Sequence, residues 1–207
     1  MKFHTDELRD FALAWVALSL GFAFFILRTN DRALLIGNPE FLVGDTFLRV
    51  LVASLVTVGA GFLLHELAHK VVAIRFGQVA AFKADYAMLG FAVVSGLAGF
   101  FWAAPGAVRH AGRITPRENG LIAVAGPVTN LVLAALFLPG LAFDGLAGEA
   151  AQLGVTANCF LAAFNMIPFG PLDGRKVVSW SVLVFAVTFL VAAAATVGAF
   201  LSVGLPY

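Results

Sequence analysis

The most informative stretch of this chain is Phe62-Leu63-Leu64-His65-Glu66-Leu67-Ala68-His69. His65 and His69 are four residues apart, so on a helix their side chains lie on one face and can bind the same metal ion. Glu66 lies beside them, where a carboxylate can accept a proton from an attacking water molecule. This H-E-x-x-H pattern is typical of zinc hydrolases. The stretch therefore predicts a zinc site on a helix, with Glu66 as the general base.

The motif stands at the end of a hydrophobic run. From Val50 to Leu64 every residue is apolar, glycine, serine or threonine. Ionisable side chains at membrane depth are costly and by default indicate a functional site. The alternative is that the two histidines only make hydrogen bonds within a helical core. The hydrophobic setting favours the metal site over this alternative.

The composition indicates a membrane protein. Of the 207 residues, 61% are hydrophobic and 12% are charged, and the mean hydropathy is +0.95. Soluble domains carry about 25% charged residues, and several apolar runs here approach the length of a transmembrane helix. The net charge of +1 gives no reason to expect nucleic acid as a partner. The single cysteine, Cys159, excludes a disulfide framework and is expected to be a small buried hydrophobic residue.

The apolar runs predict an all-α polytopic membrane protein, a bundle of about five to six transmembrane helices. We expect spans at residues 11–27, 49–75, 120–138, 150–167 and 177–205, with a polar loop at 28–48. Residues 89–108 are apolar but interrupted by glycines and a proline, which weakens the helical signal. This segment is either a further span or a re-entrant, β-like segment, which is tolerated at membrane depth when protein shields it.

The distribution of basic residues distinguishes these two topologies. With a cytoplasmic amino terminus and a re-entrant 89–108 segment, ten of the 13 lysines and arginines lie inside and three lie outside. A full crossing by 89–108 leaves five inside and eight outside. Since basic loops are enriched on the cytoplasmic side, re-entrance is favoured. The same topology places the active site towards the cytoplasmic half of the membrane.

A catalytic zinc site needs a third protein ligand beside the two histidines. There are twelve acidic residues; with Glu66 assigned as the base, Asp173 is the one left in an apolar context. Two prolines and two glycines between residues 168 and 174 break the helix next to it and free backbone groups. Elimination therefore predicts Asp173 as the third ligand. The alternative is that Asp173 only begins the last helix as a cap.

Taken together, these motifs resemble the site-2 protease family of intramembrane zinc metalloproteases. The H-E-x-x-H motif is followed by Asn165-x-x-Pro168-x-x-Pro171-Leu172-Asp173-Gly174, and Gly126-Pro127-x-x-Asn130 lies between them, although its small residues also suit helix packing. The likeness covers residues 50–180. It implies that His65, His69 and Asp173 bind Zn²⁺, that Glu66 is the base, and that Asn165 helps to hold the substrate carbonyl or oxyanion. Arg175 stands where the family often has a second glycine.

The resemblance implies an intramembrane zinc endopeptidase that hydrolyses peptide bonds within or next to transmembrane segments, as in regulated intramembrane proteolysis. We expect one membrane-embedded metalloprotease domain over residues 1–207 with a catalytic core at about 49–180, and no soluble PDZ or CBS domain such as many members carry. The expected partners are single-span or membrane-embedded protein substrates and the lipid bilayer, and the expected location is the cell membrane, with several passes. The sequence does not specify the oligomeric state.

A substrate helix must unwind before its carbonyl groups can be attacked. The 89–108 segment offers a strand edge on which an extended substrate can add by β-augmentation. Ordinary membrane packing or a lipid-facing loop is the alternative for this segment.

Two other functions fit parts of the sequence. Buried histidine and aspartate also suit an ion path, as in a zinc-binding membrane transporter, and a catalytically idle homologue would serve as a scaffold. Glu66 distinguishes them, because a hydrolase needs a base between its histidines and neither alternative obviously does.

Overall fold

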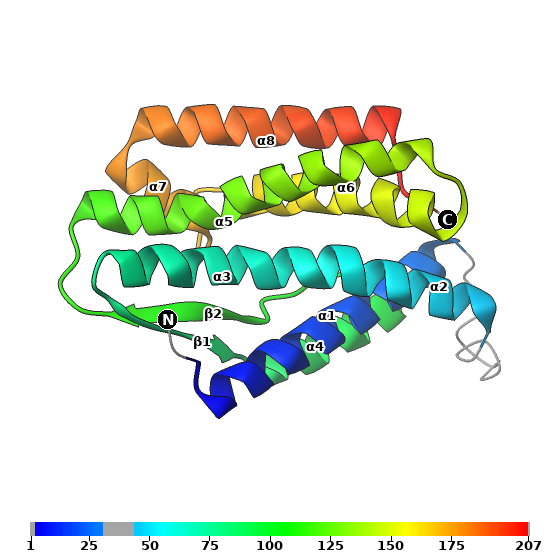
Figure 1. The fold of residues 1–207 in the computed structure, drawn as a ribbon, viewed down its shortest axis with the longest axis horizontal. Coiled ribbons are helices and arrows are strands. Elements are labelled where there is room, and N and C mark those ends of the chain that lie inside the picture. Colours follow the sequence, from blue (N-terminus) through cyan, green and yellow to red (C-terminus); the bar gives the residue numbers. More distant parts are fainter. Residues whose placement is uncertain (1–2, 31–43, 207) are drawn as a thin grey trace.

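Most of the long helices of this chain lie side by side along one axis (Figure 1). The computed structural model describes residues 3–30 and 44–206. In chain order the elements are α1 (Thr5–Asn30), α2 (Asp45–Ser54), a π-helical segment η2 (Leu55–Gly59), α3 (Ala60–Arg75), β1 (Val79–Ala84), α4 (Tyr86–Ala98), β2 (Gly106–Ala111), α5 (Pro116–Phe137), a 3-10 segment η3 (Leu138–Ala142), α6 (Gly145–Asn165), α7 (Asp173–Trp180) and α8 (Val182–Ser202).

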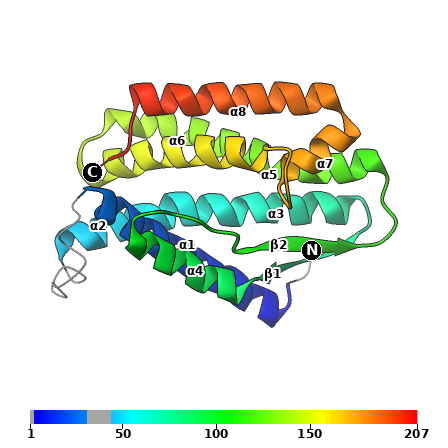
Figure 2. The same cartoon turned by 180° about the vertical axis from the view of Figure 1, so that it is seen from behind.

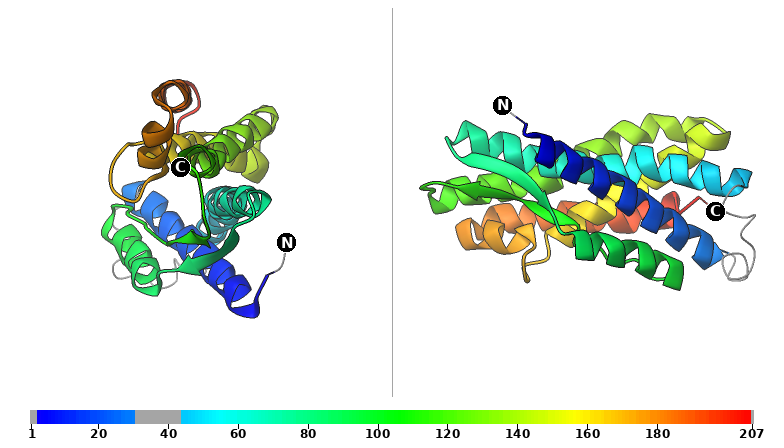
Figure 3. Two further views of the ribbon diagram at one scale, coloured as in Figure 1. Left: turned by 90° about the vertical axis from the view of Figure 1, so that its left-hand side faces the viewer. Right: turned by 90° about the horizontal axis from the view of Figure 1, so that it is seen from below.

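Helix α3, which carries the H-E-x-x-H motif, occupies the centre of the molecule. On one side lie α5, α6, α7 and α8; on the other lie the two strands with α1 and α4 (Figures 1 and 2). The end-on view shows α3 between these two groups (Figure 3). The motif is therefore covered by protein on both sides.

Four helices in the described part of the chain are long and apolar enough to cross a membrane. They are Thr5–Thr29, Asp45–Arg75, Pro116–Ala142 and Val182–Ser202. They indicate a membrane protein and overlap the spans expected at 11–27, 49–75, 120–138 and 177–205. Helix α6 forms where the remaining span was expected, but it is not among these four. The expected total of five to six spans therefore stays a prediction, and most of the expected 28–48 loop falls outside the described residues.

The structure corrects the expectation for residues 89–108. Residues 89–98 belong to helix α4, so the weak helical signal there was misleading, and within this segment the strand β2 covers only residues 106–108. Gly96 packs against α1, where its position for a Cβ lies 2.0 Å from the carbonyl oxygen of Gly21. Gly99, with a φ of 88°, ends α4 in the left-handed conformation. The glycines thus allow close packing and a sharp helix end instead of preventing the helix.

The chain is mostly helical but not purely so. Strands β1 and β2 pair antiparallel, with Phe82 opposite Val108 and Ala84 opposite Gly106. This two-stranded ribbon lies beside α3 (Figure 2). The β-like character expected for part of 89–108 is present, but as half of a ribbon whose other strand, β1, was not predicted.

The last expected span, at 177–205, is two helices. Helix α7 ends at Trp180, and Ser181 has an extended backbone with a φ of −150°. The hydroxyl oxygen of Ser181 accepts a hydrogen bond from the backbone N–H of Val184 and so caps α8. The break lets α7 approach the centre of the bundle while α8 runs along its outside (Figure 1).

Candidate metal centre

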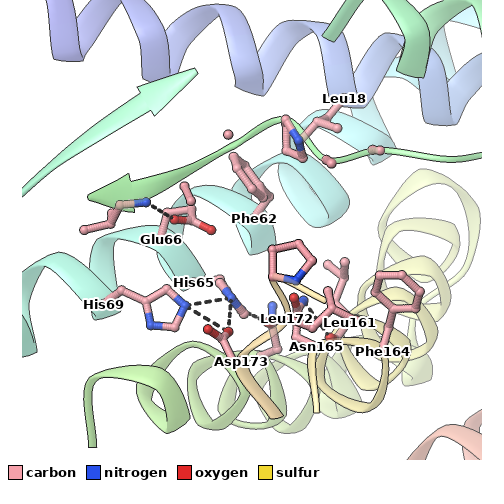
Figure 4. Close-up of a pocket in the computed structure, with 18 of the residues that line it drawn as sticks. Leu18, Phe62, His65, Glu66, His69, Leu161, Phe164, Asn165, Leu172 and Asp173 are labelled. Carbon is pink, nitrogen blue, oxygen red and sulfur yellow. Dashed lines mark hydrogen bonds and ion pairs between the residues drawn. The ribbon is translucent and has the colours of Figure 1, made fainter. Parts of the chain in front are cut away.

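The structure brings together the three residues expected to bind the metal (Figure 4). His65 and His69 lie on successive turns of α3, and Asp173 is the first residue of α7. The two Nε2 atoms are 3.0 Å apart, and Oδ2 of Asp173 lies 3.2 Å from Nε2 of His65 and 3.1 Å from Nε2 of His69. All three side chains are buried, and together they can bind a metal ion. Two histidines and one carboxylate are a donor set of catalytic zinc sites.

The other ring nitrogen of each histidine has its own acceptor. Nδ1 of His65 lies 2.6 Å from Oδ1 of Asn130, and Nδ1 of His69 lies 2.7 Å from the carbonyl oxygen of Ile122. Because both partners are acceptors, Nδ1 carries the proton in each ring and donates it. The Nε2 lone pairs are then free to face the metal, as in most histidine-ligated sites.

Asn130 is itself held in one orientation. Its Nδ2 donates to Oδ1 of Asn158 at 2.9 Å and to the carbonyl oxygen of Gly61 at 3.3 Å. With both donors used in this way, Oδ1 is the atom left to face His65. Both asparagines are fully buried, so α5 and α6 together set the ring orientation of a residue on α3.

Helix α5 also supplies the floor of the site. A Cβ on Gly126 would lie 2.5 Å from Nε2 of His65 and 2.6 Å from Nε2 of His69. No side chain fits there without displacing the histidines. The space next to the two Nε2 atoms exists because this residue is glycine, which is consistent with room for a metal ion.

Glu66 points away from the ligands and towards strand β2 (Figure 4). Its Oε2 accepts a hydrogen bond of 2.9 Å from the backbone N–H of Val108. The side chain is 7% exposed and lines the same pocket as the ligands. The structure thus places the expected base beside the metal site and against a strand.

This pocket has a volume of about 230 Å³ and is lined mainly by apolar groups. One wall is the segment from Phe101 to Val108, and another is the end of α6 with Phe164 and Asn165. Trp102 meets Phe164 edge-on, with ring centroids 6.3 Å apart. Asn165 therefore lies in the pocket as expected; one of its N–H groups donates to the carbonyl oxygen of Leu161. Its catalytic role stays a prediction.

Two further basic side chains line the pocket. Nζ of Lys176 lies 3.5 Å from Oδ1 of Asp173, the carboxylate oxygen that does not face the histidines. His110 extends from β2 into the same pocket. Burial lowers the pKa of His110, and the nearby Lys176 ammonium lowers it further.

Several residues that support the site were not singled out by the sequence. Asn158 carried a usable signal, since it is an amide inside an apolar run. Asn130 was visible as part of a motif, but its contact with His65 was not predictable. The Ile122 carbonyl and the Val108 N–H are backbone groups, which carry no signal in the side-chain pattern.

Comparison with known proteins identifies the family. "Putative zinc metalloprotease MJ0611" of Methanocaldococcus jannaschii is 40% identical over 153 residues, which cover 68% of this chain and 76% of the relative. This chain belongs to the same zinc metalloprotease family. The metalloprotease is also 34% identical over 144 residues to "Putative zinc metalloprotease YwhC" of Bacillus subtilis, covering 59% of the chain and 66% of that relative.

A third relative matches this metalloprotease over only a small part of its own length. "Putative zinc metalloprotease Rip3" of Mycobacterium tuberculosis is 34% identical over 125 residues, 58% of this chain and 28% of the relative. No family model matches the metalloprotease. No solved structure matches it at a significant level.

Proposed function

We propose that this metalloprotease is an intramembrane zinc endopeptidase of the site-2 protease type, which cleaves within or next to transmembrane segments of other membrane proteins. The observation that carries the proposal is the buried convergence of His65, His69 and Asp173 within a bundle of membrane-length apolar helices. Glu66 lines the same pocket. A base beside the ligands favours hydrolysis over zinc transport or an inactive scaffold.

Each residue has a defined task in this reaction. His65, His69 and Asp173 would hold the zinc ion, which would supply Lewis acidity for the substrate carbonyl and the attacking water. Glu66 accepts the proton of the attacking water and delivers it to the leaving nitrogen. Asn165 donates an N–H to the substrate carbonyl oxygen as negative charge develops on it. The apolar pocket excludes bulk water, which strengthens both electrostatic contributions.

The position of strand β2 favours a substrate that binds in an extended conformation. One edge of β2 pairs with β1, and residues 106, 108 and 110 line the pocket next to the ligands. A substrate segment that unwinds from its helix can satisfy its backbone groups on this second edge, apart from the Val108 N–H, which donates to Glu66. We propose single-span or membrane-embedded proteins as substrates, since the site lies among helices of membrane length.

The deciding experiment compares the parent protein with Glu66→Gln on a purified single-span substrate. The substitution keeps the side-chain volume but removes the proton acceptor. We expect cleavage by the parent, loss of cleavage with a zinc chelator, and its return with added zinc. Glu66→Gln should retain zinc and cleave about 10²–10⁴-fold more slowly.

The alternatives give different results in the same preparation. Near-normal cleavage by a zinc-loaded Glu66→Gln variant contradicts the role of Glu66 as the base. If neither protein cleaves any membrane segment and both move zinc into sealed vesicles, the protein is a transporter. If neither cleaves and neither moves zinc, a scaffold role is left.

A further inference from the structure

In one cross-strand pair of the β-ribbon, the backbone N–H of each residue donates a hydrogen bond to a carboxylate at the outer edge of its strand. Phe82 on β1 lies directly opposite Val108 on β2. The N–H of Phe82 donates to Oε1 of Glu7 at 2.9 Å, and the N–H of Val108 donates to Oε2 of Glu66 at 2.9 Å. The two amides therefore point away from each other, out of the ribbon, so neither takes part in a β1–β2 hydrogen bond.

The edge of the ribbon that faces Glu7 is anchored firmly. Both carboxylate oxygens of Glu7 lie 2.6 Å from Nζ of Lys70, and Lys70 is completely buried. Lys70 directly follows His69 on α3. Two residues along β1, the N–H of Ala84 donates to Oδ2 of Asp10 at 3.0 Å. The ribbon is thus tied to α3 through Glu7 and Lys70 on one edge and through Glu66 on the other.

We propose that the backbone N–H of Val108 is a positioning group for Glu66, an inference that rests on the proposed protease function. In the described part of the chain it makes the one hydrogen bond of the Glu66 side chain. A glutamate has three side-chain torsions and samples several rotamers unless contacts restrict it. The Val108 N–H holds Oε2 against the strand, and Oε1 is left to accept the proton of the attacking water. The other edge of the ribbon is held by two bonds, from Phe82 to Glu7 and from Ala84 to Asp10, so it stays anchored when one of them is lost.

The test removes this one donor and leaves the side chains unchanged. Exchange of the Val108 backbone amide for an ester, by incorporating the α-hydroxy analogue of valine, replaces N–H with oxygen. The matched control is the same exchange at Phe82, which removes the amide bonded to Glu7 from the opposite edge of the same pair. Each exchange removes one hydrogen bond between the ribbon and a carboxylate, but only the exchange at Val108 removes the bond to Glu66.

We expect the Val108 ester to lower kcat by about 10- to 100-fold, the size typical of a hydrogen bond to a charged group. KM and zinc content should stay within about twofold, and the Phe82 ester should keep a near-parental kcat. A parental kcat for the Val108 ester overturns the proposal, as does an equal loss in both esters. A raised KM with unchanged kcat also overturns it, because the N–H would then bind substrate instead of holding Glu66.

A second measurement does not depend on proteolysis. In protein labelled with ¹⁵N-valine, the Val108 amide should exchange faster with solvent and its proton should shift upfield in Glu66→Ala, while the Val177 amide stays unchanged. An insensitive Val108 amide in a protein that cleaves substrate refutes the positioning role alone. If the amide responds but the parent protein cleaves nothing, the protease proposal fails, and the role of the N–H in catalysis fails with it.

Discussion

At the scale of single residues, the metal site is built by contacts between helices. Each histidine on α3 presents Nε2 to the site because an oxygen atom on α5 accepts a hydrogen bond from its Nδ1–H. Asp173 reaches the same point from α7, where it is both the first helical residue and the partner of both histidines. The alternative that Asp173 serves only as a helix cap does not match the structure, because Leu172 is the N-cap residue and Asp173 contacts both histidines.

We predict that His65→Ala, His69→Ala and Asp173→Ala each lose stoichiometric zinc or bind it much more weakly. Each substitution removes one of three donors, and the remaining pair does not complete a catalytic zinc site. Metal analysis of the purified proteins measures this directly. Asp144→Ala is the control, because Asp144 precedes α6 without a side-chain capping bond. Full zinc occupancy in Asp173→Ala would contradict its assignment as a ligand.

Gly126 offers a second test of the same site. Gly126→Ala should lower zinc affinity without unfolding the protein, since the atoms nearest to the new methyl group are the ends of two imidazole side chains. The control is Gly198→Ala on α8, where a Cβ meets nothing within 4 Å. Zinc titration of both variants provides the comparison. Parental zinc affinity in Gly126→Ala would show that the space next to the Nε2 atoms is not needed.

At the scale of secondary-structure elements, the site depends on how α4 is docked. Helices α1 and α4 cross closely at Gly21 and Gly96, where a side chain on either residue would meet the backbone of the other helix. Small residues at such crossings are typical of helix packing in membranes. The segment after α4 forms one wall of the pocket and leads into β2, so this crossing helps to place the strand beside Glu66.

We predict that Gly96→Ala lowers the free energy of unfolding by about 1–3 kcal/mol, as is usual for overpacking. Its Cβ would lie 2.0 Å from the carbonyl oxygen of Gly21, a backbone atom that can move only with its helix. Gly90→Ala on the same helix is the matched control, since a Cβ there meets nothing within 4 Å. Thermal unfolding in detergent distinguishes the two. Equal stability of both variants would argue against a close crossing.

At the scale of the whole molecule, the remaining question is how the bundle lies in the membrane. The distribution of basic residues predicts that the loop after β2 is cytoplasmic and that the loop before α6 is outside. We predict that a cysteine at Arg113→Cys reacts with an impermeant label from the cytoplasmic side and one at Asp144→Cys from outside. Both variants are made in a Cys159→Ala background, because Cys159 is the single native cysteine. The reverse pattern would reject the predicted orientation.

The sequence by itself determined the pattern of the metal site and the membrane character of this protein. His65, Glu66 and His69 are close in sequence, so the 3.6-residue period of a helix is enough to place the two histidines on one face with the acid beside them. Long apolar runs are equally local, and four of the expected spans overlap helices of membrane length. Asp173 could be predicted as the third ligand by elimination, because an acidic residue in an apolar setting is costly and indicates a function.

Only the tertiary structure decided what surrounds this chemistry. The pairing of β1 with β2, the contact of Val108 with Glu66, and the contact of Asn130 with His65 join residues 22 to 65 positions apart. Gly90 and Gly96 read as helix breakers, yet both lie in α4, where Gly96 packs closely on Gly21 of α1. Helix propensity is local, whereas packing and backbone hydrogen bonds depend on which elements meet. A pattern along one chain segment does not contain that information.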